Sequence, residues 1–196
     1  MKFTIPFSLR RSLFAGFFMS LSASAADYTV DASQTSDPGR KVYQTLAELA
    51  SAGVLAAGDT VILNNDDSSL TSKLPVLVNF RSNDPETPRT VDAPARVFFY
   101  NNSSSSAPIS LKISDNVSFT KNYSSDRNSF TANGYGGAIC LYSSAATALS
   151  MGNNAMFADN RAAGNGGAIS IHSYGKTASL TIGNNAVFSG NYASGN

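Results

Sequence analysis

One sequence pattern occurs three times in the second half of the chain and limits what the chain can fold into. It reads Leu-x-Ile/Met-x-Asp/Asn-Asn-x-x-Phe-x-x-Asn, and its copies begin at Leu111, Leu149 and Leu180. A Gly-Gly-Ala-Ile signature lies between the copies. Self-similarity at a near-constant period is typical of a solenoid, in which each repeat buries its apolar face against its neighbours. The recurring residues shape the backbone, so the pattern does not indicate an enzyme active site.

The two signatures supply the candidate structural and adhesive residues. The first comprises Gly136, Gly137, Ala138 and Ile139, followed by Gly166, Gly167, Ala168 and Ile169. The second is Phe-x-x-Asn, at Phe119 and Asn122, Phe130 and Asn133, Phe157 and Asn160, and Phe188 and Asn191. The pair Phe130/Asn133 is a spare copy inside the longer segment between the first two repeats. By the same spacing, a third Gly-Gly would fall just after Asn196, so we expect this chain to be the front part of a longer protein.

Alternating apolar residues predict three short strands in each repeat. In the last repeat they are residues 167–171, 180–182 and 186–188, and the inward positions keep the same parity in the earlier repeats. The pattern therefore predicts an all-β fold, a right-handed parallel β-helix. Its phenylalanines would form an internal ladder. Its asparagines would occupy left-handed turns or bond to one another between coils. Each glycine pair would supply a backbone conformation that a Cβ forbids, or allow tight packing.

The rest of the chain predicts four regions. Residues 1–26 read as a secretory signal peptide, with Lys2, Arg10 and Arg11 before an apolar stretch and a small-residue cleavage site. Residues 27–75 would form an N-terminal cap and the first coils, with a helix at about 45–53 and a strand at about 60–64. Thr45 is its expected N-cap, with Glu48 completing a capping box. Residues 76–110 would be irregular coils and loops with one buried strand at 97–100, and residues 111–196 the β-helix repeats, truncated at the C-terminus.

Charge and residue usage exclude several classes of partner. Removal of the signal peptide takes away three of the 14 basic residues and none of the 13 acidic ones, which leaves a net charge of −2. No basic stripe is present, so we expect no nucleic-acid partner. One histidine and one cysteine cannot form a metal cluster, and we expect neither a metal nor a cofactor. Alternation places Cys140 outward, as a tolerated thiol or in an intermolecular disulfide.

Acidic residues in the repeats do not predict catalysis. Polysaccharide cleavage on a β-helix needs two or three acids on one outer face. Asp115, Asp126 and Asp159 fall at different points of the repeat, although Lys112, Lys121 and Arg161 lie nearby. We therefore expect the chain not to be an enzyme.

The alternation of Gly-Gly-Ala-Ile with Phe-x-x-Asn after a signal peptide resembles the polymorphic membrane proteins of chlamydia-type bacteria, over roughly residues 111–196. The resemblance implies an exported autotransporter passenger at the outer membrane, cell surface or outside the cell. The implied activity, part of virulence, is adhesion to a host cell-surface molecule, protein or glycan, by multivalent display. Membrane attachment would come only through a C-terminal β-barrel, which these residues do not include.

Two other functions fit the same sequence. Thr45 to Leu63 is similar to the opening of pectate-lyase-like β-helices, which implies a carbohydrate-active β-helix. A purely structural coil that self-associates through an open C-terminal rung is the other. The sequence leaves open the receptor, the anchoring, the oligomeric state and whether Cys140 forms disulfides.

Overall fold

A computed structural model of the chain describes residues 24–102, 106–125 and 134–195. The signal peptide predicted for residues 1–26 falls almost entirely outside these residues, as do Phe130 and Asn133. The N-terminal half begins with β1 and continues through a short 3-10 helix and one α-helix to β6. The bounds are β1 Asp27–Val30, η1 Pro38–Arg40, β2 Val42–Tyr43, α1 Leu46–Ser51, β3 Thr60–Leu63, β4 Asn79–Ser82, β5 Arg89–Asp92 and β6 Phe98–Asn102.

The C-terminal half consists of strands that recur in the same order in each repeat. They are β7 Ile109–Ile113, β8 Val117–Thr120, β9 Tyr123–Ser124, β10 Ile139–Ser143, β11 Thr147–Met151, β12 Met156–Ala158, β13 Arg161–Ala162, β14 Ile169–Ser173, β15 Ala178–Ile182, β16 Val187–Ser189 and β17 Tyr192–Ala193. The α-helix and the strand expected at about 45–53 and 60–64 are present as α1 and β3.

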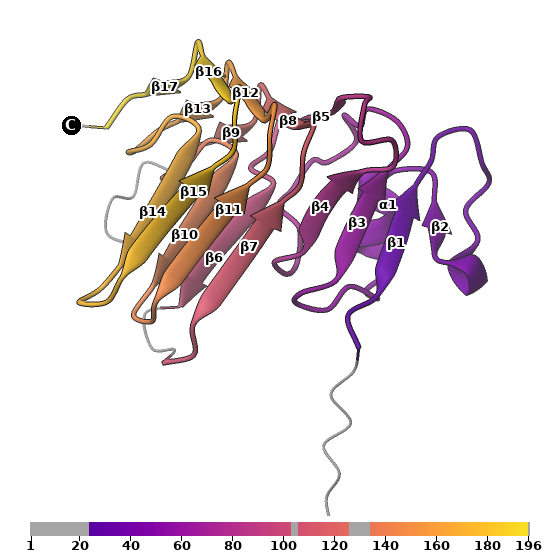
Figure 1. Cartoon of the computed structure of the whole chain (residues 1–196), viewed down its shortest axis with the longest axis horizontal. Helices are drawn as coiled ribbons and strands as arrows, with labels where there is room; N and C mark the ends of the chain where they lie inside the picture. Colours follow the sequence, from indigo (N-terminus) through magenta and orange to yellow (C-terminus); the bar gives the residue numbers. More distant parts are fainter. Residues whose placement is uncertain (1–23, 103–105, 126–133, 196) are drawn as a thin grey trace, which may run out of the picture.

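Four parallel sheets organise these strands. Sheet A has the order β15-β11-β7-β4-β3-β1-β2, sheet B β16-β12-β8-β5, sheet C β14-β10-β6 and sheet D β17-β13-β9. The ladders between these strands are parallel. Between β10 and β14 the chain therefore passes through sheets C, A, B and D and returns to C, one coil further on. In Figure 1 the strands of sheet C run down to the turns at the lower left, the strands of sheet A run back up from them, and the short strands of sheets B and D lie along the upper edge.

The register between coils follows the predicted repeat alignment. Leu111, Leu149 and Leu180 are Cα partners in sheet A. In sheet C, Ile139 is opposite Ile169 and Leu141 is opposite Ile171. A strand pairing that slipped by one residue would turn every inward side chain outward, so this agreement fixes which residues fill the interior.

Two features of the repeat differ from the prediction. Each full coil has four strands, because a two-residue strand in sheet D (β13 in the second repeat) follows the Phe-x-x-Asn motif. Two residues are too few to show an alternating pattern. In addition, β14 starts at Ile169, after the glycine pair, because Gly166 has a positive φ of 69° that is incompatible with an extended strand.

The segment 76–110, predicted to hold irregular coils and loops around one strand at 97–100, contains β4 and β5 in addition to β6, which lies at the expected strand. Pro85, Pro88 and Pro94 lie between these strands and not inside them, so no ladder hydrogen bond is lost. Parallel pairing of β3 with β4 and of β5 with β8 supplies the order that local sequence does not indicate.

One continuous apolar core runs through the coils. It includes Leu46 and Leu49 of α1, Phe80 of β4 and the inward residues of every later coil except the last. Thr45 caps α1, since its hydroxyl accepts the Glu48 N–H at 3.1 Å. Glu48 reaches back one residue further than predicted, because its carboxylate accepts the backbone N–H of Gln44 at 3.1 Å. The helix is thus fixed at its first turn.

Candidate functional site

The first glycine of each pair holds a left-handed backbone conformation. Gly136 has φ = 62° and Gly166 has φ = 69°. A Cβ on either residue would also collide with the carbonyl of the isoleucine three residues later. Both the backbone angle and the missing space therefore require glycine here.

The second glycine of each pair allows two coils to approach. A Cβ on Gly137 would meet the Gly167 carbonyl of the next coil and the backbone of Arg161, and a Cβ on Gly167 would lie 2.7 Å from the backbone nitrogen of Tyr192. The two roles that the sequence left as alternatives are thus divided between the two glycines. The Ala-Ile part of the motif is interior, since Ala138 and Ile139 are fully buried and Ala168 is nearly so.

The repeated phenylalanines form the predicted internal ladder. The ring centroids of Phe119 and Phe157 are 5.3 Å apart, and those of Phe157 and Phe188 are 5.1 Å apart with the planes 5° from parallel. Phe80 and Phe98 extend this phenylalanine ladder towards the N-terminus by edge contacts with Phe119. Such stacking adds to the free energy gained from burial of the rings.

The repeated asparagines bond from coil to coil. Asn160 Nδ2 donates to the Phe119 carbonyl at 3.0 Å, and its Oδ1 accepts the Asn122 backbone N–H at 3.0 Å. Asn191 repeats both bonds one coil later, to Phe157 and Asn160. Asn122 and Asn160 are completely buried, so these bonds satisfy backbone groups that water cannot reach.

Left-handed turns occur beside this ladder and not at it. Lys121, Asp159 and Gly190, the residues before the ladder asparagines, have φ between 53° and 61°. The second asparagine series has the conformation itself, with φ of 57° at Asn116, 55° at Asn154 and 58° at Asn185. Of the two predicted roles, the left-handed turn describes the second series, and bonding between coils describes the ladder asparagines.

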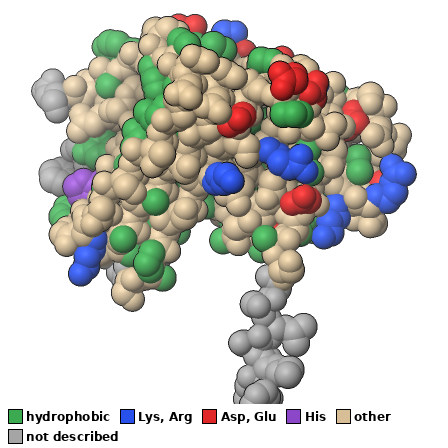
Figure 2. Space-filling view, viewed as in Figure 1, with side chains coloured by type: hydrophobic (Ala, Val, Ile, Leu, Met, Phe, Trp, Pro, Cys, Tyr) green, Lys and Arg blue, Asp and Glu red, His purple; other side chains and the backbone are tan. Residues whose placement is uncertain are grey.

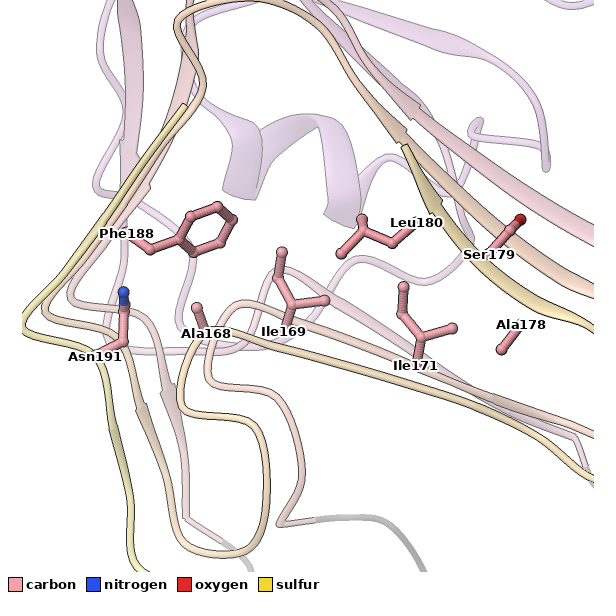
Figure 3. Close-up of a pocket in the computed structure, with 8 residues that line it drawn as sticks. All are labelled: Ala168, Ile169, Ile171, Ala178, Ser179, Leu180, Phe188 and Asn191. Carbon is pink, nitrogen blue, oxygen red and sulfur yellow. The ribbon is translucent and has the colours of Figure 1, made fainter. Parts of the chain in front are cut away.

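The last coil exposes residues that are buried in the coils before it. Leu180, Ile182 and Phe188 are 42–46% exposed, whereas their partners one coil earlier, Leu149, Met151 and Phe157, are at most 2% exposed. A hollow of about 510 Å³ lies over this face, and Figure 3 shows Phe188, Ile169, Leu180 and Ile171 directed into it. The hollow is the continuation of the coil interior and has no separate polar machinery.

The structure corrects the predicted environment of Cys140. This side chain was expected to face outward, but it is 1% exposed. Burial raises the pKa of its thiol to about 11, and the nearby Arg96 guanidinium lowers that pKa only in part. A buried, protonated thiol is a poor nucleophile, so this environment disfavours an intermolecular disulfide.

The acidic residues have structural partners. Asp115 accepts the backbone N–H of Asn153 at 2.8 Å in the next coil. Asp67 is 6% exposed and accepts the Leu46 N–H of α1 at 2.9 Å. Asp31 accepts hydrogen bonds from Ser33, Gln34 and Asn64, which hold the pKa of its carboxyl well below the usual range. No group of histidines, cysteines and acids suited to a metal ion occurs among the residues that the structure describes.

Two ring side chains from adjacent coils come together on sheet C. Tyr142 and His172 are Cα partners, and their rings stack with centroids 4.8 Å apart. Tyr174, which sequence reasoning did not single out, contacts both rings. It lies in a turn beyond the strand, where the period of the repeat gives no signal. In the described ranges, no helix has the length and apolar character needed to cross a membrane.

Comparison with known proteins identifies the repeats. The model of the Chlamydia polymorphic membrane protein repeat matches residues 116–142 and 154–172. These ranges include the ladder residues Phe119 and Phe157 and both Gly-Gly-Ala-Ile signatures. No curated protein and no solved structure matched the chain. The C-terminal half of this chain therefore carries the repeat of the chlamydial polymorphic membrane proteins.

Proposed function

We propose that the chain is a surface-exposed passenger segment of an autotransporter-type outer-membrane protein, and that it acts as an adhesin. The observation that supports this proposal most is the position of the repeat residues within the coils. Its glycines, phenylalanines and asparagines serve the interior and the coil-to-coil contacts. The repeat motifs do not occupy the outward side chains and turns, which suits a scaffold that displays binding groups.

The finer architecture belongs to the same proposal. The coils form a right-handed parallel β-helix, and the segment containing α1 covers its N-terminal end. Burial of Leu46 and Leu49 against the coil core supports this role for α1. A cap is needed because the end of a coil stack otherwise exposes apolar side chains and unpaired strand edges.

Display on such a scaffold acts through multivalency. Stacked coils repeat outward positions at about 4.8 Å, so one receptor-bearing surface can meet several of them. Linked weak contacts reach an avidity well above that of a single contact. The ligand is a molecule of the host cell surface.

Binding of purified residues 27–196 to host cells tests the proposal. We expect saturable binding, measured by flow cytometry with labelled protein and competed by unlabelled protein. The Phe157→Ala variant serves as the control for a weakened scaffold. Absence of saturable binding, while a longer form of the protein binds, would remove the function from this segment.

Self-association through the last coil is a second candidate, because that face exposes Leu180 and Phe188. It predicts oligomers whose size rises with protein concentration in analytical ultracentrifugation. Leu180→Asp would then restore the monomer. Thr181→Asp would not, because Thr181 is the next residue of β15 and its side chain points to the opposite face of the sheet. A monomer at every concentration contradicts this candidate. For the carbohydrate-active alternative, the described acids offer no supporting geometry.

A further inference from the structure

An exposed group of three aromatic rings lies on the outer side of sheet C. We call Tyr142, His172 and Tyr174 the aromatic cluster. The Tyr142 and His172 rings are stacked at 4.8 Å with planes 12° apart. The Tyr174 ring stands nearly perpendicular to both, with centroids 5.7 Å from Tyr142 and 4.7 Å from His172.

These contacts hold the rings in place before any ligand arrives, because each ring touches the other two. Tyr174 is nevertheless 58% exposed, and His172 is exposed as well. A ligand that covers Tyr174 would therefore lose little rotamer freedom on the protein side, which lowers the cost of binding.

Among the residues that the structure describes, few charged side chains lie near the aromatic cluster. The ion pairs among the described residues involve Arg40, Arg81 and Lys121, on other elements. On the face shown in Figure 2, charged side chains gather over the N-terminal half and are sparse over the C-terminal coils. Lys176 is the nearest charged residue along the chain. A nucleic acid that stacked on these rings would need several cations for its phosphates, and the described residues place no such group of cations at the aromatic cluster.

The size of the cluster also argues against a protein partner as its main occupant. A stable protein interface covers about 800 Å² on each side, with an apolar centre ringed by polar residues. Three rings that are mutually covered offer a much smaller apolar area. The exposed Tyr174 ring suits one face of a sugar ring, which presents C–H groups to an aromatic face and hydroxyls around its rim.

We propose that the aromatic cluster binds the apolar face of a pyranose ring in a neutral, β-linked glycan. The exposed Tyr174 ring would contact the axial C–H groups, while the Tyr174 hydroxyl and the His172 imidazole would hydrogen-bond to the sugar hydroxyls. This inference rests on the proposed adhesin function and names the chemical class of its host ligand.

Nuclear magnetic resonance tests the proposal directly. The chain has a single histidine, so the imidazole signal of untagged protein reports on this site alone. Cellotetraose and chitotetraose are the probes. We expect either probe, at millimolar concentration, to shift the His172 signal. Saturation of the aromatic protons should reach the sugar protons of one ring face.

Matched variants separate the site from the rest of the surface. Tyr174→Ala should reduce the saturation transfer at least fivefold, and Tyr174→Phe should retain most of it because the ring remains. Tyr192→Ala removes a tyrosine of similar exposure, 54%, on sheet D and should change nothing. No transfer from either probe, or equal transfer in Tyr174→Ala and the unaltered chain, would overturn the proposal.

The outcome is independent of the cell-binding experiment. Cell binding that persists in Tyr174→Ala, without any glycan signal, would leave the adhesin function standing and remove the glycan site. A glycan signal without cell binding would retain the site and reject the adhesin function of this segment.

Discussion

At the scale of single residues, the recurring geometry of the coil depends on glycines, which lack a side chain. Gly136 and Gly166 lack a side chain where φ is positive and where the following turn leaves no space. Gly137 lacks one where the next coil approaches. The Gly-Gly signature of the sequence is thus a steric requirement. The free energy of unfolding lost on substitution has two sources, backbone strain and collision of the added Cβ.

Substitution of two glycines with similar φ separates these effects. Gly175 has φ = 61°, and a Cβ added to it would have no atom within 4 Å. Gly136 has φ = 62°, and a Cβ added to it would collide with the Ile139 carbonyl. We expect Gly175→Ala to lower the free energy of unfolding by about 1 kcal/mol, from backbone strain alone. Gly136→Ala should lower it by about 3 kcal/mol or more. Urea denaturation followed by circular dichroism measures both, and equal losses would contradict the assigned collision.

Cys140 gives a second prediction at this scale. Because its thiol is buried and its pKa is raised to about 11, it should be protonated and inaccessible at pH 8. We expect Ellman's reagent to react with it at pH 8 only after unfolding in guanidinium chloride. Rapid labelling of the folded chain, at the rate of a free thiol such as glutathione, would show that the side chain is exposed.

At the scale of elements, strands stack because equivalent residues meet in register. Phe119, Phe157 and Phe188 are partners in sheet B, and their rings stack in the same order. Asn122, Asn160 and Asn191 then close the corner after each of these strands by bonding to the coil before. The extra residues of the first repeat lie between β9 and β10 and do not disturb this register.

The phenylalanine ladder predicts unequal contributions from two equivalent residues. Phe157 is fully buried between Phe119 and Phe188, and Phe188 is 46% exposed at the end of the ladder. Phe157→Ala should cost about 3–5 kcal/mol of unfolding free energy, as for a typical core phenylalanine. Phe188→Ala should cost about half as much or less, since part of its ring is already in water. The comparison uses thermal or urea unfolding, and equal losses would indicate that Phe188 is covered in solution.

At the scale of the whole molecule, the two ends of the stack differ. The N-terminal end buries α1 and a set of acidic side chains that hold loops together, Asp31, Asp59 and Asp67. The C-terminal end exposes a complete apolar rung. The N-terminal end is therefore sensitive to protonation of Asp31, whereas the C-terminal end is sensitive to apolar contact.

Acid should destabilise the chain through Asp31. The native pKa of this carboxyl is lowered by hydrogen bonds from Ser33, Asn64 and Gln34. An unfolded aspartate has a pKa of about 3.9, so the stabilisation is fully present above that pH and is lost as pH falls towards the lower native value. Asp31→Asn should lower stability at pH 7 and flatten the loss between about pH 4 and pH 2. Asp27→Asn, which breaks only an exposed ion pair with Arg81, is the control and should leave the profile nearly unchanged. Identical acid profiles for Asp31→Asn and the unaltered chain would contradict this role.

The sequence by itself determined the repeat period, the inward phenylalanines and aliphatic residues, the parallel register and the helix that begins after Thr45. These features depend on local periodicity and on capping chemistry, which neighbouring residues fix. Only the tertiary structure decided the fourth strand of each coil, the order within residues 76–110, the burial of Cys140 and the contact of Tyr174 with Tyr142 and His172. Each of these depends on what an adjacent coil or turn supplies. A short strand, a covered thiol and a ring from a neighbouring turn acquire their environment from residues about thirty positions away, so no local pattern could specify them.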